Sequence, residues 1–286
     1  MSYPSGPRLG LVVVQRTERG TGRGLVRACH PGPTLAVTVL TALLAWSAGH
    51  TPARGLLVTA AVLTGQLSIG WSNDLVDVRR DRAVGRPDKP VAAGEVSETV
   101  VRAACGVALV ACVGLSLACG WRSALVHLVL GVASGWAYNL WFKRTPLSPL
   151  PYAVAFAALP AVVTLALPSP AWPPGWVLVT GALLGVGAHL LNVLPDLADD
   201  EATGVRGLPH RLGERVVRWL APAVLLAGSA VAAYGPGGGS LDGTGLALLL
   251  ACVVLAVAAV VARGRLPFVA AVLIALADVV SLVLRS

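Results

Sequence analysis

Long apolar runs alternate with short polar segments along almost the whole chain. Each run is about 17–25 residues long, which is the length that an α-helix needs to cross a bilayer. The sequence therefore predicts nine transmembrane helices, over residues 34–49, 54–72, 99–119, 123–141, 150–167, 175–195, 216–234, 245–262 and 267–284. We expect an all-α integral membrane bundle in which the lipid bilayer is the main surrounding medium.

The composition agrees with this pattern. Hydrophobic residues make up 56% of the 286 residues and charged residues only 13%, whereas an ordinary soluble domain carries roughly 25% charged residues. This excludes a soluble globular enzyme. Long polar linkers are absent between the apolar runs, so we expect one membrane domain over residues 31–286. Residues 1–30 form a basic tail without a long apolar core, which argues against a cleavable signal peptide.

The positions of the basic residues predict the orientation in the membrane. Of the 22 Lys and Arg residues, 18 fall in the tail and in every second loop between the predicted helices. Under the positive-inside rule these segments are cytoplasmic, so we expect a multi-pass protein of the cell inner (plasma) membrane. The net charge of +8 is therefore explained by topology, and we expect no nucleic acid as a partner. The excess of Arg over Lys is typical of a high-GC bacterium.

Acidic residues are concentrated in two segments that repeat each other. Of the 14 acidic residues, 11 lie in residues 74–98 and 196–214, each at the cytoplasmic end of a predicted helix. Residues 73–95 and 192–214 share nine identities at an offset of 119. Because the two copies belong to the second and sixth helices, they enter the membrane in the same direction. They are parallel repeats, unlike the inverted repeats of many transporters.

Each copy presents oxygen atoms on one helical face. The spacing places three side chains at i, i+4 and i+8, which stack along an α-helix. Asp74 and Asp199 lie beside these ladders, which consist of Asn73, Asp77 and Asp81 in the first copy and Asn192, Asp196 and Asp200 in the second. So many carboxylates require cations. Hard oxygen ligands favour Mg²⁺ or Ca²⁺, completed by substrate phosphates. The alternative to a metal site is that these residues are helix-terminal charges solvated at the membrane surface.

Basic residues near the acids supply candidates for holding a diphosphate. They are Arg86, Lys89, Lys143 and Arg144, with Arg82 and Arg206 as weaker candidates. A departing diphosphate needs positive charge beyond that of the metal, although a single loop arginine more often serves topology and lipid headgroups. His189 lies one turn deeper than Asn192 on the same face and is a candidate for a polar group of the cavity. Asp278, alone in the ninth predicted helix, has no assigned role.

These motifs resemble the UbiA superfamily of intramembrane prenyltransferases. The first motif, N-D-x-x-D-x-x-x-D, is read at residues 73–81 and the second, D-x-x-x-D, at residues 196–200. The resemblance implies nine transmembrane helices in two pseudo-repeated four-helix halves plus one helix. It also implies a polyprenyl diphosphate bound through Mg²⁺, which the acidic residues of both motifs would hold, while Arg86, Lys89 and Lys143 would grip the diphosphate.

The resemblance extends to a tyrosine before Lys143, with a difference in spacing. It implies that Tyr138 lines the reacting centre beside Lys143. The family commonly spaces these residues by three, whereas Tyr138 and Lys143 have four residues between them. An extra residue rotates a helical side chain by about 100°, so the pair faces one cavity only if the helix ends first. Asn139 is the alternative catalytic side chain.

The function that the resemblance implies is transfer of an isoprenoid chain to a small acceptor. In this family the acceptor is usually an aromatic ring, and a dry cavity protects the carbocation-like C1 from water. The alternative is a terpene cyclase, which ionises the same diphosphate and needs no acceptor. Cyclases need aromatic walls for the cation, and 5% aromatic residues favours transfer slightly. A cation-coupled transporter and a non-catalytic scaffold fit the two acidic segments less well.

Overall fold

The computed structural model describes residues 21–197, 200, 204–264 and 266–285. Within these residues the secondary structure is helical and contains no strand. Asp199, one of the predicted metal ligands, lies outside the described residues. The all-α fold class predicted from the sequence is therefore confirmed for the described part of the chain.

The described helices follow the predicted apolar runs closely. The described part of the chain begins with a short helix, Thr21–Ala28. It continues through α2 (Pro31–Ser47), α3 (Pro52–Ala83), α4 (Glu98–Ala118), α5 (Trp121–Val126), η1 (His127–Val132), α6 (Ala133–Leu140), η2 (Phe142–Arg144), α7 (Leu150–Thr164), α8 (Gly175–Val193), η3 (Leu194–Asp196), α10 (Leu208–Leu212), α11 (Glu214–Tyr234), α12 (Gly243–Val261) and α13 (Leu266–Arg285).

Six helical segments of the described residues are long and apolar enough to cross a membrane. One of them, Trp121–Leu140, consists of α5, η1 and α6, and another, Gly175–Asp196, consists of α8 and η3. A seventh span is added if Thr21–Ala28 and α2, which meet at an angle of 64°, count as one broken span. Two shorter apolar helices, Leu150–Thr164 and Leu266–Ser281, fall below the length of a full span. The chain therefore has the helices of a multi-pass membrane protein, while the total of nine spans stays a prediction.

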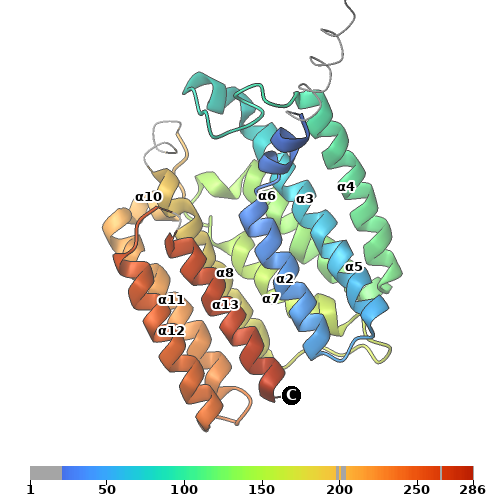
Figure 1. Cartoon of the computed structure of the whole chain (residues 1–286), viewed down its shortest axis with the longest axis vertical. Coiled ribbons are helices and arrows are strands. Elements are labelled where there is room, and N and C mark those ends of the chain that lie inside the picture. The colour runs from blue at the N-terminus through green and yellow to red at the C-terminus, as the bar shows by residue number, and fades with distance from the viewer. Residues whose placement is uncertain (1–20, 198–199, 201–203, 265, 286) are drawn as a thin grey trace, which may run out of the picture.

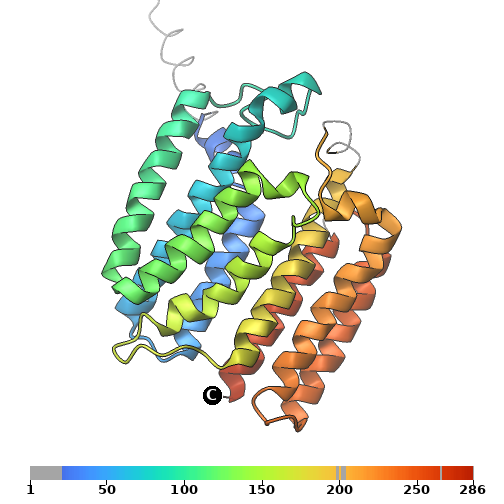
Figure 2. The ribbon, with the colours of Figure 1, turned by 180° about the vertical axis from the view of Figure 1, so that it is seen from behind.

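The helices form a bundle in which the two acidic segments reach the same end. Figures 1 and 2 show α4 at one edge of the bundle and α11 and α12 at the opposite edge. One core cluster joins α2, α3, α5 and α7, and another joins α2, α8, α11, α12 and α13. The segments that follow α3 and α8 lie at the end opposite the C-terminus in Figure 1. This packing brings segments 119 residues apart in the sequence to a common site.

The two acidic ladders differ in their helical geometry. α3 is continuous to Ala83 and carries the whole first ladder. By contrast, α8 ends at Val193 and is followed by the 3₁₀ turn η3. The prediction of a single helix through Asn192, Asp196 and Asp200 is therefore wrong. Pro195 explains the break, because proline lacks the N–H that continues an α-helix and its ring crowds the preceding turn.

Paired glycines of the two copies share a backbone conformation. Gly85, which follows the end of α3, has φ of 67°, and its counterpart Gly204 has φ of 79°. Gly94 and Gly213 form a second pair, with φ of 77° and 79°. Residues with a side chain rarely adopt these values. The shared conformation explains why glycine occupies both positions of each pair.

Candidate active site

A cavity of about 250 Å³ lies where the two acidic segments meet. Its wall includes two groups of oxygen-bearing side chains, which we name the first acidic set (Asn73, Asp77 and Asp81) and the second acidic set (Asn192, Asp196 and Asp200). Arg86, Lys89 and Lys143 also line it. The structure thus brings together most of the residues that the sequence analysis selected, and it places cations directly beside the acids.

Asp77 is the most tightly held member of the first acidic set. Its exposed fraction is 3%, and Lys143 Nζ donates hydrogen bonds to both of its carboxylate oxygens, at 2.7 Å for Oδ2. Arg80 Nη2 lies 3.0 Å from the same Oδ2. Burial lowers the pKa of Lys143, although the Asp77 carboxylate opposes this shift. The carboxylate and the two cations stabilise one another only as a group, since each alone would be a buried charge.

The second acidic set is more open and is held by cations from the first half of the chain. The Asp196 side chain is 47% exposed, and its Oδ1 accepts a hydrogen bond of 3.0 Å from Arg86 Nη2. Asp200 Oδ1 lies 3.9 Å from Arg80 Nη2, and its Oδ2 lies 3.6 Å from Nε2 of His210. Burial and the nearby Asp196 raise the pKa of Asp200 to about 6. Arg80 therefore connects the two sets, and Arg86 ties the second set to the loop that follows α3.

Arg86 is oriented by a second acid in its own loop. Its guanidinium donates two hydrogen bonds to Asp88, each 2.8 Å long. These bonds lower the pKa of Asp88 to about 2, against the opposing effect of burial, and the same bonds raise the pKa of Arg86. A bidentate pair of this kind fixes the plane of the guanidinium. Asp88 thus directs the remaining donors of Arg86 toward Asp196 and the cavity.

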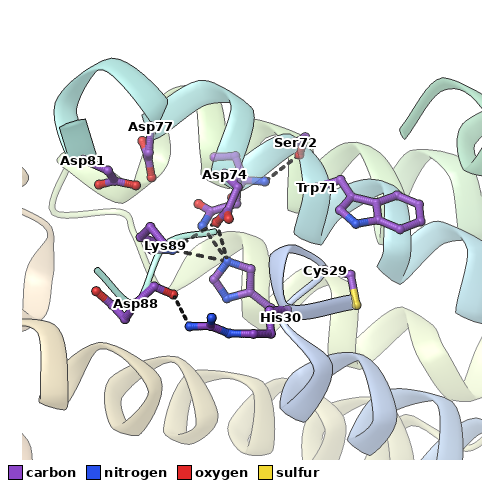
Figure 3. A network of polar contacts seen from close by, with 12 residues as sticks. Cys29, His30, Trp71, Ser72, Asp74, Asp77, Asp81, Asp88 and Lys89 are labelled. Carbon is purple, nitrogen blue, oxygen red and sulfur yellow. Dashed lines mark hydrogen bonds and ion pairs between the residues drawn. The ribbon is translucent and has the colours of Figure 1, made fainter. Parts of the chain in front are cut away.

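His30 organises a polar network behind the first acidic set (Figure 3). Its Nε2 lies 3.1 Å from Asp74 Oδ1 and 3.1 Å from Asn73 Nδ2. Lys89 Nζ donates to the same Asp74 oxygen at 3.2 Å. Although burial opposes the charged ammonium, Asp74 and Asp81 raise the pKa of Lys89. Asp74, a predicted metal ligand, does not line the cavity among the described residues, and instead it holds His30 and Lys89 in place.

Tyr138, Asn139 and Lys143 all reach the cavity because their helix ends early. α6 stops at Leu140, and Trp141 leaves the helical conformation with φ of −133° before the 3₁₀ turn η2. This break cancels the rotation that the long spacing would cause on a continuous helix. Asn139 donates to the carbonyl of Ile69 at 2.9 Å and to Ser72 Oγ at 2.8 Å. Its amide therefore ties α6 to α3.

Arg144, predicted to bind diphosphate, is not brought to the cavity. Its side chain is exposed, while the neighbouring Lys143 is buried and lines the wall. Residues 142–144 form the 3₁₀ turn η2, in which successive side chains point about 120° apart. Only one of the two adjacent basic residues can face inward. The structure thus selects Lys143 of this pair.

Aromatic rings line the cavity deeper than the acids. Tyr138 packs edge-on against Tyr152 and His189, with ring centroids 5.1 and 5.5 Å apart, and Tyr152 stacks on Phe156 at 6.4 Å. His189, the predicted polar cavity residue, is fully buried, and its Nε2 lies 3.1 Å from Ser148 Oγ. The cavity therefore changes from acidic to aromatic within a few turns of helix.

The oxygen donors suit a hard divalent cation, but their present partners are basic side chains. Among the described residues no group of three or more His, Cys, Asp and Glu side chains is placed to hold a metal ion. Mg²⁺ prefers carboxylate and carbonyl oxygens and completes its shell with phosphate oxygens and water. Both acidic sets offer such atoms to one cavity. Metal binding would require Arg80 and Lys143 to move from the carboxylates toward the incoming anion.

Several cavity residues escaped the sequence analysis. His30 falls within the predicted basic tail, Arg80 is one of the basic residues that topology alone explains, and Tyr152 belongs to no motif. His210 and Phe156 also line the cavity. Only Arg80 has a signal in the sequence, because it follows Asp77 by three residues and therefore lies next to it on the surface of α3. The others are brought to the site by packing between helices.

Comparison with known proteins places the chain among intramembrane prenyltransferases. The UbiA prenyltransferase family matches residues 35–276. The bacteriochlorophyll synthase 33 kDa chain of Cereibacter sphaeroides is 33% identical over 183 residues, which cover 59% of each chain. Digeranylgeranylglyceryl phosphate synthase of Halobacterium salinarum is 30% identical over 222 residues, which cover 76% of this chain and 78% of that protein.

Solved structures agree on the fold. A UbiA homologue from Aeropyrum pernix superposes with a TM-score of 0.73 at 16% identity, covering 88% of this chain and 98% of that one. A UbiA homologue from Archaeoglobus fulgidus bound to GPP and Mg²⁺ gives a TM-score of 0.68 at 14% identity, covering 92% of this chain and 99% of that one. Both likenesses extend over most of the chain.

Proposed function

Since this chain belongs to the UbiA prenyltransferase family, we propose that it is a Mg²⁺-dependent membrane prenyltransferase that moves an isoprenoid chain from a polyprenyl diphosphate to a small acceptor. One observation carries the proposal. Two acidic sets, separated by 119 residues in the sequence, and four Lys and Arg side chains line a single cavity that continues into aromatic walls. A diphosphate head and a hydrocarbon tail require this order of surroundings.

Each group of the cavity has a task in this reaction. The two acidic sets would hold Mg²⁺, which supplies positive charge to the diphosphate. Lys143, Arg80 and Arg86 are cationic side chains at the cavity wall. They would stabilise the negative charge that develops as the C1–O bond breaks and its electron pair leaves with the diphosphate. The acceptor then attacks C1 and releases a proton. Preorganised cations of this kind act most strongly where water is excluded.

The acceptor that we propose is aromatic. Tyr138, Tyr152 and Phe156 present ring faces and edges to the cavity beside the acidic sets. Edge-on and offset contacts between rings are favourable, so a planar acceptor fits between these side chains. The same rings can face the cationic C1. His189 and Ser148 offer hydrogen-bonding groups to a polar substituent on the acceptor.

We also propose the finer arrangement in the membrane. Nine transmembrane helices would form two pseudo-repeated four-helix halves plus one, with α2 first and α13 last. The acidic end of the bundle would face the cytoplasm of a bacterial cell and the protein would lie in the plasma membrane, because the basic residues concentrate in the loops at that end. The helix-forming segments and the paired glycines of the two copies support this arrangement.

The test is diphosphate release by detergent-purified protein supplied with geranyl, farnesyl or geranylgeranyl diphosphate and Mg²⁺. We expect release to depend on an added aromatic acid and to stop when EDTA removes the metal. The prenylated acceptor should be found by mass spectrometry. Release of diphosphate with a cyclic hydrocarbon and without an acceptor would assign a terpene cyclase instead. No release from any prenyl diphosphate, with every acceptor class tried, would overturn the proposal.

A further inference from the structure

His30 reaches the cavity in an unusual backbone conformation. Among the described residues it is the only one other than glycine with a positive φ, at 56°. It lies between the helix Thr21–Ala28 and α2, where the helical axis turns by 64°. A residue with a side chain adopts this conformation at a cost, and such residues cluster at functional sites. Because His30 also lines the cavity, its imidazole is a candidate for a role at the site.

One ring nitrogen of His30 has three polar neighbours (Figure 3). Its Nε2 lies 3.1 Å from Asn73 Nδ2, 3.4 Å from Lys89 Nζ and 3.1 Å from Asp74 Oδ1. An ammonium group can only donate, so Lys89 requires a lone pair at Nε2. Asp74 Oδ1 receives a hydrogen bond of 3.2 Å from the same ammonium. These contacts fit a neutral ring that carries its proton on Nδ1 and accepts hydrogen bonds at Nε2.

The side chain of Asn73 has two unlike ends, of which only one suits a cation. Its Nδ2 is directed to His30, while its Oδ1 makes no hydrogen bond among the described residues. Asn73 belongs to the first acidic set at the cavity wall. A carbonyl oxygen is a ligand for Mg²⁺, whereas an NH₂ group only donates and would repel the ion. Unlike the carboxylates of Asp77 and Asp81, this amide must therefore be held in one of its two orientations.

Building on the prenyltransferase function proposed above, we propose that His30 is a positioning residue that keeps the Asn73 amide oxygen directed toward the metal site. Its accepting Nε2 binds the NH₂ end of the amide and so leaves the oxygen available to the cavity. Turning the amide over would lose this hydrogen bond and present NH₂ to the metal. Groups that orient a metal ligand in this way typically contribute 10–100-fold to metal affinity.

The experiment measures metal affinity without turnover. The readout is the Mg²⁺ concentration that gives half-maximal binding of radiolabelled geranyl thiolodiphosphate, an uncleavable analogue, to the purified protein. His30→Asn preserves the backbone, because asparagine tolerates positive φ, but it has no atom at the place of Nε2. We expect this concentration to rise about 10-fold in His30→Asn. In His30→Gln, whose carbonyl oxygen can replace the accepting nitrogen, it should stay within about threefold of native.

Asn73→Asp provides the background that separates positioning from a purely structural role. A carboxylate presents oxygen in either orientation, so its alignment needs no hydrogen-bond acceptor at His30. Adding His30→Asn to Asn73→Asp should therefore change the half-maximal Mg²⁺ concentration by less than about twofold. An equal rise in the native and Asn73→Asp backgrounds would overturn the proposal, because loss of structural support would affect both alike.

A further pair of variants decides the matter if Asn73→Asp does not bind the analogue. His30→Gln and His30→Leu have side chains of similar size, and only glutamine accepts a hydrogen bond. Weaker Mg²⁺ dependence in His30→Leu alone supports the positioning role, while equal values in the two variants contradict it. Either contradiction leaves prenyl transfer intact. If native protein fails to bind the analogue at any Mg²⁺ concentration, the proposed function itself fails.

Discussion

The two acidic sets face one cavity but hold their charge in different ways. In the first set, Asp77 is almost fully buried and is neutralised within a few ångströms by Lys143 and Arg80. In the second set, the Asp196 side chain is 47% exposed and depends on Arg86 from the loop that follows α3. The first set is carried by a continuous helix, while Pro195 breaks the second. The same motif thus produces a rigid half-site and an open half-site.

This difference indicates how the site would respond to its substrate. The backbone of the first acidic set is preformed, because its three residues lie on the continuous helix α3, so that only the side chains of Lys143 and Arg80 would have to turn when a metal binds. The second set can adjust, since its backbone is irregular and water reaches Asp196. Preorganised groups contribute most to catalysis, whereas an adjustable partner allows a metal and diphosphate to enter. We therefore expect changes in the first set to have the larger consequences.

The largest effect is expected for Asp77→Asn compared with Asp196→Asn. Asp77→Asn leaves Lys143 and Arg80 buried without their main counter-charge, which typically costs about 3–5 kcal/mol of unfolding free energy. Diphosphate release should fall by about 10³-fold, compared with about 10–100-fold for Asp196→Asn. Activity assays and thermal unfolding in detergent measure both quantities. Equal losses of activity and stability in the two variants would contradict a rigid first half-site.

Lys143→Met tests the cation of the first half-site, with Arg144→Met as the matched control. Lys143 Nζ bonds Asp77 at the cavity wall, while the neighbouring Arg144 is exposed. We expect Lys143→Met to lower kcat for diphosphate release about 100-fold, and Arg144→Met to change it less than about twofold. Because the two residues are adjacent, a general effect of charge on membrane insertion would affect both. A comparable loss of kcat in Arg144→Met would show that Arg144 also faces the cavity in the active protein.

Arg80→Gln tests whether Arg80 links the two half-sites or only helps to set the orientation of the protein in the membrane. Arg79→Gln is the control. Arg80 lies beside Asp77 and Asp200, and its Nε and Nη1 are buried without a hydrogen-bond partner among the described residues. Arg79 is exposed on the same turn of α3. We expect KM for the prenyl diphosphate to rise about 10-fold in Arg80→Gln, and to stay unchanged in Arg79→Gln. An unchanged KM in both would mean that Arg80 only neutralises the acids.

The sequence could predict the helices and the acidic sets because both follow from local patterns. Apolar runs mark helices wherever lipid surrounds them, and the spacing of Asn73, Asp77 and Asp81 fixes their common face. The boundaries of α4 and α11 consequently differ from the predicted ones by no more than two residues. The sequence could also predict that the two acidic segments share one site, since both enter the membrane in the same direction and so lie at one end of the bundle.

Tertiary packing determined what the sequence could not supply. His30 reaches Asp74 only because the backbone turns sharply between Thr21–Ala28 and α2. This approach needs Gly70, where an added Cβ would collide with the carbonyl oxygen of Cys29. The ring contacts of Tyr152 join residues on α6, α7 and α8. No local pattern encodes such contacts, so residue type alone could not identify these members of the site.

The smallest effect is expected for Pro195→Ala, which would make the second half-site resemble the first. Alanine restores the backbone N–H and favours continuation of α8, so the protein should be slightly more stable. We expect a regular helix to turn the Asp196 side chain away from Arg86. The misplaced carboxylate should lower the rate of diphosphate release by roughly 3–10-fold. The Mg²⁺ concentration that gives half-maximal activity should also rise in this variant. Full activity with normal Mg²⁺ dependence would instead show that the open geometry of the second acidic set is incidental to its function.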